Sequence, residues 1–322
     1  MKISKKLRVM AAAIALTLFG TVACVTGTVA WFVASNVVEV TGTTVQAEAE
    51  EGIVIANETH TADAHWGQKV AVSHNGQYDN PDYVDENTTP DVDEKLQAAF
   101  IPTSTSDGST WYHANAENVD HQSAGSNTVS AITVTPDSDG LGKYDINGTS
   151  TNAADDKNVY LVNKVYIQAS ATSALNHQDL FVNSISVASS SQALSKSLRV
   201  LFKVTANLGG GTAAEKIYAP LATGTSVVHD YDGTGTLTDG HGHTITGASS
   251  TVTAYKTAAS GANDKILDDC TIPAYLTAGT NAIEISVYIY FEGEDFNCKS
   301  SNIVASLETL VLTFKFENKA HA

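Results

Sequence analysis

Apolar and polar residues alternate with a period of two along most of this 322-residue chain after about residue 35. In the segment 282–292 one face carries Ile283, Ile285, Val287, Ile289 and Phe291. Successive side chains of a β-strand point to opposite faces, so this period indicates a strand with one face in a core and the other toward solvent. The pattern predicts half-buried antiparallel strands.

The same alternation recurs in six further segments, at 37–49, 126–135, 158–170, 180–189, 198–204 and 310–316. Clusters of Gly, Asn, Asp and Ser separate these segments, and no helical period is sustained. Such a series of short strands predicts an all-β chain that folds as a two-sheet antiparallel sandwich of jelly-roll type. The segment 158–170 is apolar on both faces, which favours a central strand, and 93–100 is expected to form one or two helical turns.

The N-terminus has the pattern of an export signal. Lys2, Lys5, Lys6 and Arg8 precede an uncharged apolar run at 9–34, and Thr28–Ala30 offers a small-residue cleavage site. The run is also long enough to cross a bilayer uncleaved. Residues 1–34 are therefore predicted to be a signal peptide or a membrane anchor, and the rest of the chain is expected to be secreted or displayed on the cell surface.

We expect residues 35–322 to form a single β-sandwich domain, because no hinge of linker composition divides them. Two ranges are predicted to be loop insertions, near 73–126, which is rich in Asn, Asp and His, and near 209–264, which is rich in Gly and Thr. Long loops of this kind carry functional contacts more often than the strands that they join.

The charge balance and the cysteines limit the partners and the compartment. The formal net charge is -17 at pH 7, which opposes binding to nucleic acid. Outside the leader the chain has Cys270 and Cys298, whose one possible disulfide would close a loop worth about 3–4 kcal/mol. Two free thiols are the alternative, since some Gram-positive surfaces lack strong oxidative folding.

One acidic cluster, which contains Asp79, Asp82, Asp85 and Glu86, could supply oxygen ligands to Ca²⁺. The alternative is a solvated loop, because the spacing matches no calcium loop and Pro81 interrupts the segment. No other cofactor is expected. Histidines that could hold Zn²⁺, namely His60, His65, His229, His241 and His243, are interpreted as exposed polar residues.

No enzyme motif stands out in the sequence. There is no HExxH, no GxSxG and no phosphate-binding loop, and the carboxylates of Glu292, Glu294 and Asp295 follow a strand, as a charged turn would. We therefore expect a protein without enzymatic activity.

The segment 31–49 joins the export signal directly to strand-like sequence. Cleavage after Ala30 would leave a free apolar strand, which could pair with the sheet of a neighbouring copy as a donor strand. The residues expected to carry this assembly are Trp31, Phe32, Val37, Val38 and Val40. The alternative is that Trp31 and Phe32 anchor a membrane helix at its interface and that 37–45 pairs within its own domain.

The stretch Gly27-Thr-Val-Ala-Trp-Phe32 and the following Val45-Gln-Ala resemble the start of exported proteins processed by a SipW-type signal peptidase, among them the TasA/camelysin-like biofilm matrix proteins of Gram-positive bacteria. The segments 193–200, 217–220 and 287–295 are similar to strands of surface proteins that share this leader. The resemblance implies a jelly-roll-like sandwich, export and fibre assembly in the matrix. Some camelysin-like members are labelled metallopeptidases, but no zincin motif is present here to carry over.

Two functions follow as expectations. The first is a structural protein of the surface or extracellular matrix, a fibre subunit whose partners are other copies of itself or related surface proteins, besides signal peptidase and, if the leader stays, the membrane through 9–34. The second is a membrane-anchored adhesin or carbohydrate-binding module. In that case Trp66, Trp111 and Tyr112 would stack on sugars, unless these rings belong to the core.

Overall fold

The structure is a computed structural model that describes residues 38–41, 43–50, 52–56, 66–72, 97–105, 107–114, 126–136, 140–145, 156–189, 194–206, 210–220, 227–238, 244–253, 265–275, 281–292 and 310–322. The regular elements in these ranges are β-strands, apart from one 3₁₀ turn, η1 (Leu194–Ser197). The all-β prediction is thus confirmed for the described part of the chain. The predicted leader lies outside these residues, and no helix within them is long and apolar enough to cross a membrane.

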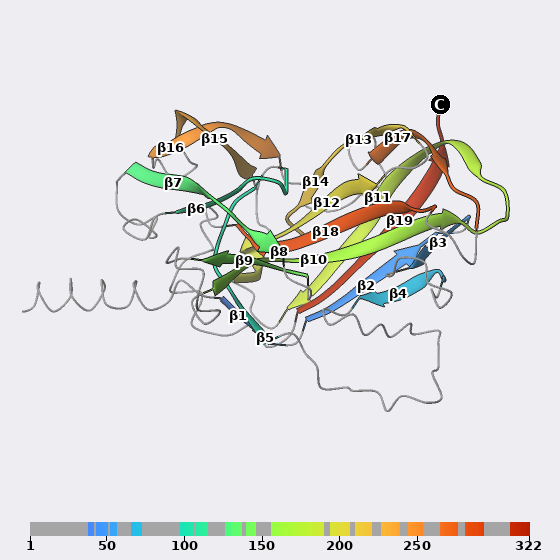
Figure 1. Cartoon of the computed structure of the whole chain (residues 1–322), viewed down its shortest axis with the longest axis horizontal. Helices are drawn as coiled ribbons and strands as arrows, with labels where there is room; N and C mark the ends of the chain where they lie inside the picture. Colours follow the sequence, from blue (N-terminus) through green and yellow to red (C-terminus); the bar gives the residue numbers. More distant parts are fainter. Residues whose placement is uncertain are drawn as a thin grey trace, which may run out of the picture.

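The first sheet has nine strands (Figure 1). Its main path runs in the order β1 (Val38–Thr41), β5 (Gln97–Phe100), β10 (Asp156–Ala169), β18 (Ile283–Phe291), β12 (Leu198–Ala206) and β14 (Lys216–Tyr218). Three shorter strands lie off this path: β3 (Ile53–Ala56) and β9 (Leu141–Asp145) pair with β10, and β8 (Thr135–Pro136) pairs with β9. The strand β10 is central, as its two apolar faces predict.

The second sheet has six strands, in the order β13 (Thr212–Ala213), β17 (Lys265–Ile272), β11 (Leu175–Ser189), β19 (Leu310–Ala320), β2 (Thr43–Ala49) and β4 (Lys69–Val72). The C-terminal strand β19 lies between β11, with which it pairs antiparallel from Leu310 to Ala320, and β2, with which it pairs parallel from Leu310 to Phe316. The last residues of β19 thus pair with β11 along one edge.

A third sheet of four strands consists of β15 (Val227–Thr238), β16 (Thr244–Thr253), β7 (Ser126–Ile132) and β6 (Trp111–Ala114). The range 209–264, predicted to be an insertion, contributes β13 and β14 to the two larger sheets and β15 and β16 to this one. The range 73–126 contributes β5 and β6. Division of the chain into a leader and a single domain stays a prediction.

Most strand pairs are antiparallel, as predicted, but three are parallel: β2 with β19, β5 with β10, and β7 with β16. The members of each pair are far apart in the sequence, so no tight turn imposes an antiparallel direction on them. Periodicity alone does not reveal which distant strands meet.

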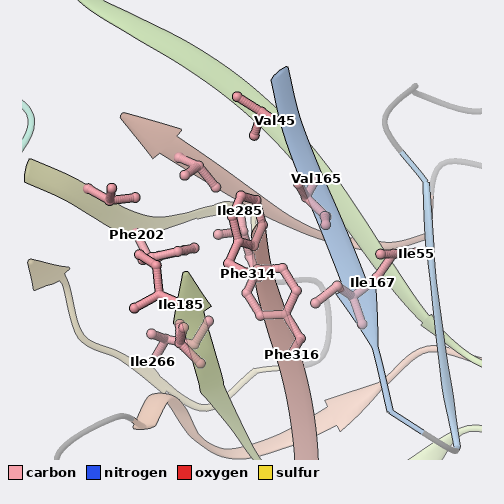
Figure 2. Close-up of a cluster of buried hydrophobic side chains, with 14 of the residues drawn as sticks. Val45, Ile55, Val165, Ile167, Ile185, Phe202, Ile266, Ile285, Phe314 and Phe316 are labelled. Carbon is pink, nitrogen blue, oxygen red and sulfur yellow. The ribbon is translucent and has the colours of Figure 1, made fainter. Parts of the chain in front are cut away.

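The two larger sheets bury one hydrophobic core between them. The ring of Phe202 in β12 lies 5.2 Å from that of Phe314 and 6.0 Å from that of Phe316, both in β19 of the opposite sheet. Figure 2 shows side chains from both sheets meeting in this cluster. Face-to-face burial of this kind agrees with the predicted sandwich. The jelly-roll connectivity stays a prediction.

A second core covers the other face of β18 and β12, so the prediction that these strands are half-buried is wrong. Ile101 and Trp111, from the segment that leads into the third sheet, pack there with Leu201 and Tyr290. The ring of Trp111 lies 4.7 Å from that of Tyr160 and 5.0 Å from that of Tyr290. A third layer therefore buries residues that the alternation assigns to solvent.

The expected helix over 93–100 is also wrong where it is described, because Gln97–Phe100 is the strand β5. It pairs with β1 along four residues, and Ile101 donates its N–H to the carbonyl of Asn158 in β10. Residues 93–96 lie outside the described part of the chain. Sheet pairing overrides the local helical tendency of Gln97-Ala-Ala.

Gly140 occupies a position that we expect to reject any side chain. It has a left-handed φ of 76°, and a Cβ there would lie 2.5 Å from the carbonyl oxygen of Val162. Gly210 has nearly the same φ, 74°, but a Cβ added there would have no atom within 4 Å. Gly210→Ala is expected to lower the free energy of unfolding by about 1–2 kcal/mol for the backbone strain alone. Gly140→Ala should cost clearly more, and equal losses in urea denaturation would contradict this.

Candidate assembly edge and charged corner

The strand β1 lies at one end of the nine-stranded sheet and pairs with β5. The antiparallel register is Val38↔Phe100, Glu39↔Ala99, Val40↔Ala98 and Thr41↔Gln97. Phe100 is buried and its ring lies 6.3 Å from that of Phe291, so the acceptor strand β5 is fixed to the core. The N-terminal strand of the described residues, β1, is therefore an edge strand, and it pairs with β5, whose Phe100 is buried in the core.

A single residue separates β1 from β2. β1 ends at Thr41 in the nine-stranded sheet, and β2 begins at Thr43 in the six-stranded sheet, with Gly42 between them. β2 is held on both sides, by β19 and by β4, and Val45 and Ala47 are buried in the core. β1 is thus joined to a firmly held strand by one residue, and glycine is the residue type that permits the widest range of backbone angles.

Among the residues predicted to carry assembly, Val38 and Val40 lie on β1. Trp31, Phe32 and Val37 lie outside the described residues. The sequence indicates a strand at 37–49, and the structure divides this range into β1 and β2, which belong to different sheets.

The second feature is a cluster of charges at the C-terminal end of the chain, here called the charged corner, formed by Asp179, Lys265, Asp268 and His321. Lys265 Nζ lies 2.7 Å from Asp179 Oδ2 and 2.6 Å from Asp268 Oδ1. His321 Nδ1 lies 2.9 Å from Asp179 Oδ1 and 3.5 Å from Asp268 Oδ1. Two carboxylates thus face two basic side chains from three different segments.

The protonation of the charged corner follows from these contacts. Burial would by itself raise the pKa of Asp179, but the Asp269 N–H, Lys265 and His321 all donate to its carboxylate and together hold the pKa well below its ordinary value. The bond to Asp179, and then that to Asp268, raises the pKa of Lys265. The bond to Asp179 likewise raises the pKa of His321. The arrangement therefore favours an ionised Asp179 and a cationic Lys265.

The ligand atoms of Asp179, Asp268 and His321 lie within 4.8 Å of one another, a spacing that suits a bound cation. Lys265 already places its ammonium group between the two carboxylates. The cluster thus contains its own cation, the ammonium group of Lys265, within 2.7 Å of both carboxylates. No sequence pattern indicates the cluster, because its members come from β11, β17 and the C-terminus and share no spacing motif.

A strained pair borders the charged corner. His177 and Asp269 have left-handed φ values of 53° and 46°, which are uncommon for residues with a side chain. His177 Nδ1 lies 2.9 Å from Asp269 Oδ1, and the strand register shifts at the same place. The bulge lets the Asp269 N–H reach the carboxylate of Asp179.

Glu292 is not part of an exposed charged turn, and that interpretation of it is wrong. It is fully buried and accepts a hydrogen bond of 3.0 Å from the Ser104 hydroxyl. Arg199, also fully buried, donates to the carbonyls of Lys196 and Leu198. Burial raises the pKa of the neighbouring Tyr290, the carboxylate of Glu292 raises it further, and Arg199 lowers it. Segment 101–105 is what covers Glu292, and Glu294 and Asp295 lie outside the described residues.

The aromatic residues considered for sugar stacking are distributed differently. Trp111 is buried in the second core, so its ring cannot offer a face to a sugar. Trp66 and Tyr112 are partly buried. Of the two alternatives for Trp111, sugar stacking and core packing, the structure supports core packing.

The remaining predicted sites are described only in part. Cys270 is buried, and burial raises its thiol pKa to about 11. Cys298 lies outside the described residues, so the disulfide stays a prediction. The calcium candidates Asp79, Asp82, Asp85 and Glu86 also lie outside them, as do His60, His65, His241 and His243, whereas His229 lies on β15.

Comparison of the chain with models of known protein families, with curated proteins and with solved structures gave no match.

Proposed function

We propose that this protein is a non-enzymatic structural component of the cell surface or extracellular matrix, built as a jelly-roll-like sandwich, and that its copies assemble into fibres by exchange of β1. The observation that supports this most is the place of β1: an N-terminal edge strand, seated on β5 and joined through Gly42 to a strand of the other sheet. Edge strands offer unpaired backbone groups to another chain, and short connections favour exchange between copies.

The proposed exchange keeps every hydrogen bond of the β1–β5 pair. If the chain extends at Gly42, β1 continues outward from β2 and reaches the β5 of a neighbouring copy, where the same register can form. The acceptor β5 remains anchored through Phe100. Exchange of an identical element costs little because the pairing that is broken within one copy forms again between two copies.

The test uses full-length chains exported by a secreting host, in two populations that carry Val40→Cys and Ala98→Cys. We expect filaments in electron micrographs and, after mild oxidation, covalent links between chains of the two populations, because these residues are partners in the β1–β5 register. Removal of residues 31–40 should leave monomers. Monomers in the unaltered protein would contradict the proposed function.

The matched control mixes chains with Ser186→Cys and Thr313→Cys, which are partners in the β11–β19 register. This pair joins two strands that do not exchange, so no link between chains is expected. The unaltered protein, with its own Cys24, Cys270 and Cys298, measures background oxidation. Filaments without covalent links between Val40→Cys and Ala98→Cys chains would support a fibre function but would exclude assembly by exchange of β1.

The alternative is a membrane-anchored carbohydrate-binding module. Burial of Trp111 removes one of the three rings proposed for it. Saturable binding on a glycan array that is lost in Trp66→Ala or Tyr112→Ala would favour this alternative over the fibre subunit.

A further inference from the structure

The end of β19 is held by one residue from the charged corner, His321. Its backbone N–H donates to the carbonyl of His177 at 2.7 Å, and its ring Nδ1 contacts Asp179 and Asp268. From Glu317 onward β19 pairs with β11, after its pairing with β2 has ended at Phe316. Among the described residues, β11 is thus the one strand that pairs with β19 beyond Phe316, and the contacts of His321 hold the end of this segment.

The groups that face His321 come from three elements. On β11 these are His177 and Asp179, on β17 they are Lys265, Asp268 and Asp269, and on β19 itself they are Glu317 and Lys319. Lys319 pairs with Glu317 at 3.2 Å, and His177 pairs with Asp269. This leaves the carboxylates of Asp179 and Asp268 to be balanced by Lys265 and His321.

The charge count of this inner set depends on His321. With a protonated imidazole, two carboxylates face two cations at distances from 2.6 to 3.5 Å. With a neutral imidazole, Lys265 alone faces both carboxylates, and the cluster carries an excess negative charge. Opposite charges at this spacing attract, and a carboxylate with fewer cationic partners is less well compensated.

We propose that residues 317–322, the end of β19 and the two residues that follow it, form a pH-sensitive latch. The latch is closed while His321 carries a proton and opens when His321 loses it. The latch does not depend on the proposed assembly through β1, which lies at the edge of the other sheet.

The direction of the pH dependence follows from the contacts of His321. Its pKa is raised above the ordinary value of 6.5, first by the bond to Asp179. A group whose pKa is raised in the folded state contributes stability below its ordinary pKa and loses it as the pH rises through the folded value. The latch is therefore closed below the ordinary pKa of histidine and opens as the pH rises through the raised pKa of His321.

Hydrogen exchange at the C-terminus of the full-length protein tests the latch. We expect amides of 317–322 to be several-fold more protected at about pH 5 than at about pH 8, after correction for the intrinsic exchange rate. Amides of 312–316, which pair with strands on both sides, serve as the internal reference and should show no such change. Equal protection of 317–322 at both pH values would overturn the proposal.

Two variants separate His321 from the other groups. His321→Gln keeps a polar side chain but does not titrate, so its protection should be low and independent of pH. Asp268→Asn keeps the imidazole and should shift the midpoint of the transition to lower pH. The same pH dependence in His321→Gln would assign the effect to His177 and overturn the latch. If His321→Gln does not fold, titration of the His321 ring by NMR in the unaltered protein decides, since a midpoint at or below 6.5 would exclude the latch.

Discussion

Glu292→Ala is expected to lower the free energy of unfolding by about 3–5 kcal/mol, the typical cost of removing one of two opposite charges that are buried in the same region. Glu292 is fully buried and accepts a hydrogen bond from the Ser104 hydroxyl. Its carboxylate raises the pKa of Tyr290, which the buried Arg199 lowers. Without its carboxylate, the interior holds the arginine charge with less negative compensation, and the Ser104 hydroxyl loses its acceptor. Urea denaturation measures the loss.

Glu284 on the same strand, β18, provides the matched control. Its carboxylate pairs with Lys164 at 2.8 Å, and the lysine is half-exposed. Exposed ion pairs contribute about 0–1 kcal/mol, so Glu284→Ala should have a small effect. If Glu284→Ala and Glu292→Ala lower the free energy of unfolding by the same amount, the burial of Glu292 does not make its carboxylate important for stability. Glu292→Gln should fall between the two, because the amide oxygen can still accept from Ser104.

Phe202→Ala is expected to cost about 3–5 kcal/mol, as other large-to-small changes of buried aromatic residues do. The Phe202 ring is fully buried and makes edge contacts with Phe314, Phe316 and Tyr218 at 5.2, 6.0 and 5.5 Å. Two of these rings belong to the opposite sheet, so the cavity would open between the sheets. The midpoint of urea denaturation should fall with no large change in slope.

Phe202→Leu separates the loss of volume from the loss of an aromatic ring. Leucine fills most of the space and should recover more than half of the stability that Phe202→Ala removes. A destabilisation by Phe202→Ala of less than about 1 kcal/mol would mean that the two sheets do not share the core described here.

The strand β1 is part of the nine-stranded sheet and is also the strand that we propose is exchanged between copies. The sheets are closed over two cores, and β2, the strand next to β1 in the sequence, is fixed between β19 and β4. Exchange of β1 would leave these cores intact, because the strand lies at a sheet edge. The proposed exchange is therefore compatible with retention of both cores in each copy.

The period of two was sufficient to predict strands at 158–170, 180–189, 198–204, 282–292 and 310–316, and all of these are strands in the structure. It also placed Ile283, Ile285 and Val287 correctly in the core. Alternation depends only on which face of a strand is apolar, and that information is local to each segment.

The sequence alone thus determined the class of fold and the inward face of each main strand. Tertiary structure decided the rest: the parallel pairing of β2 with β19, the third layer that buries Trp111 and Glu292, and the meeting of Asp179, Lys265, Asp268 and His321. These outcomes join residues that are distant in the sequence, and each residue alone is compatible with an exposed surface. Only the packing of the sheets determines which distant side chains share a buried space and which charges must then compensate one another.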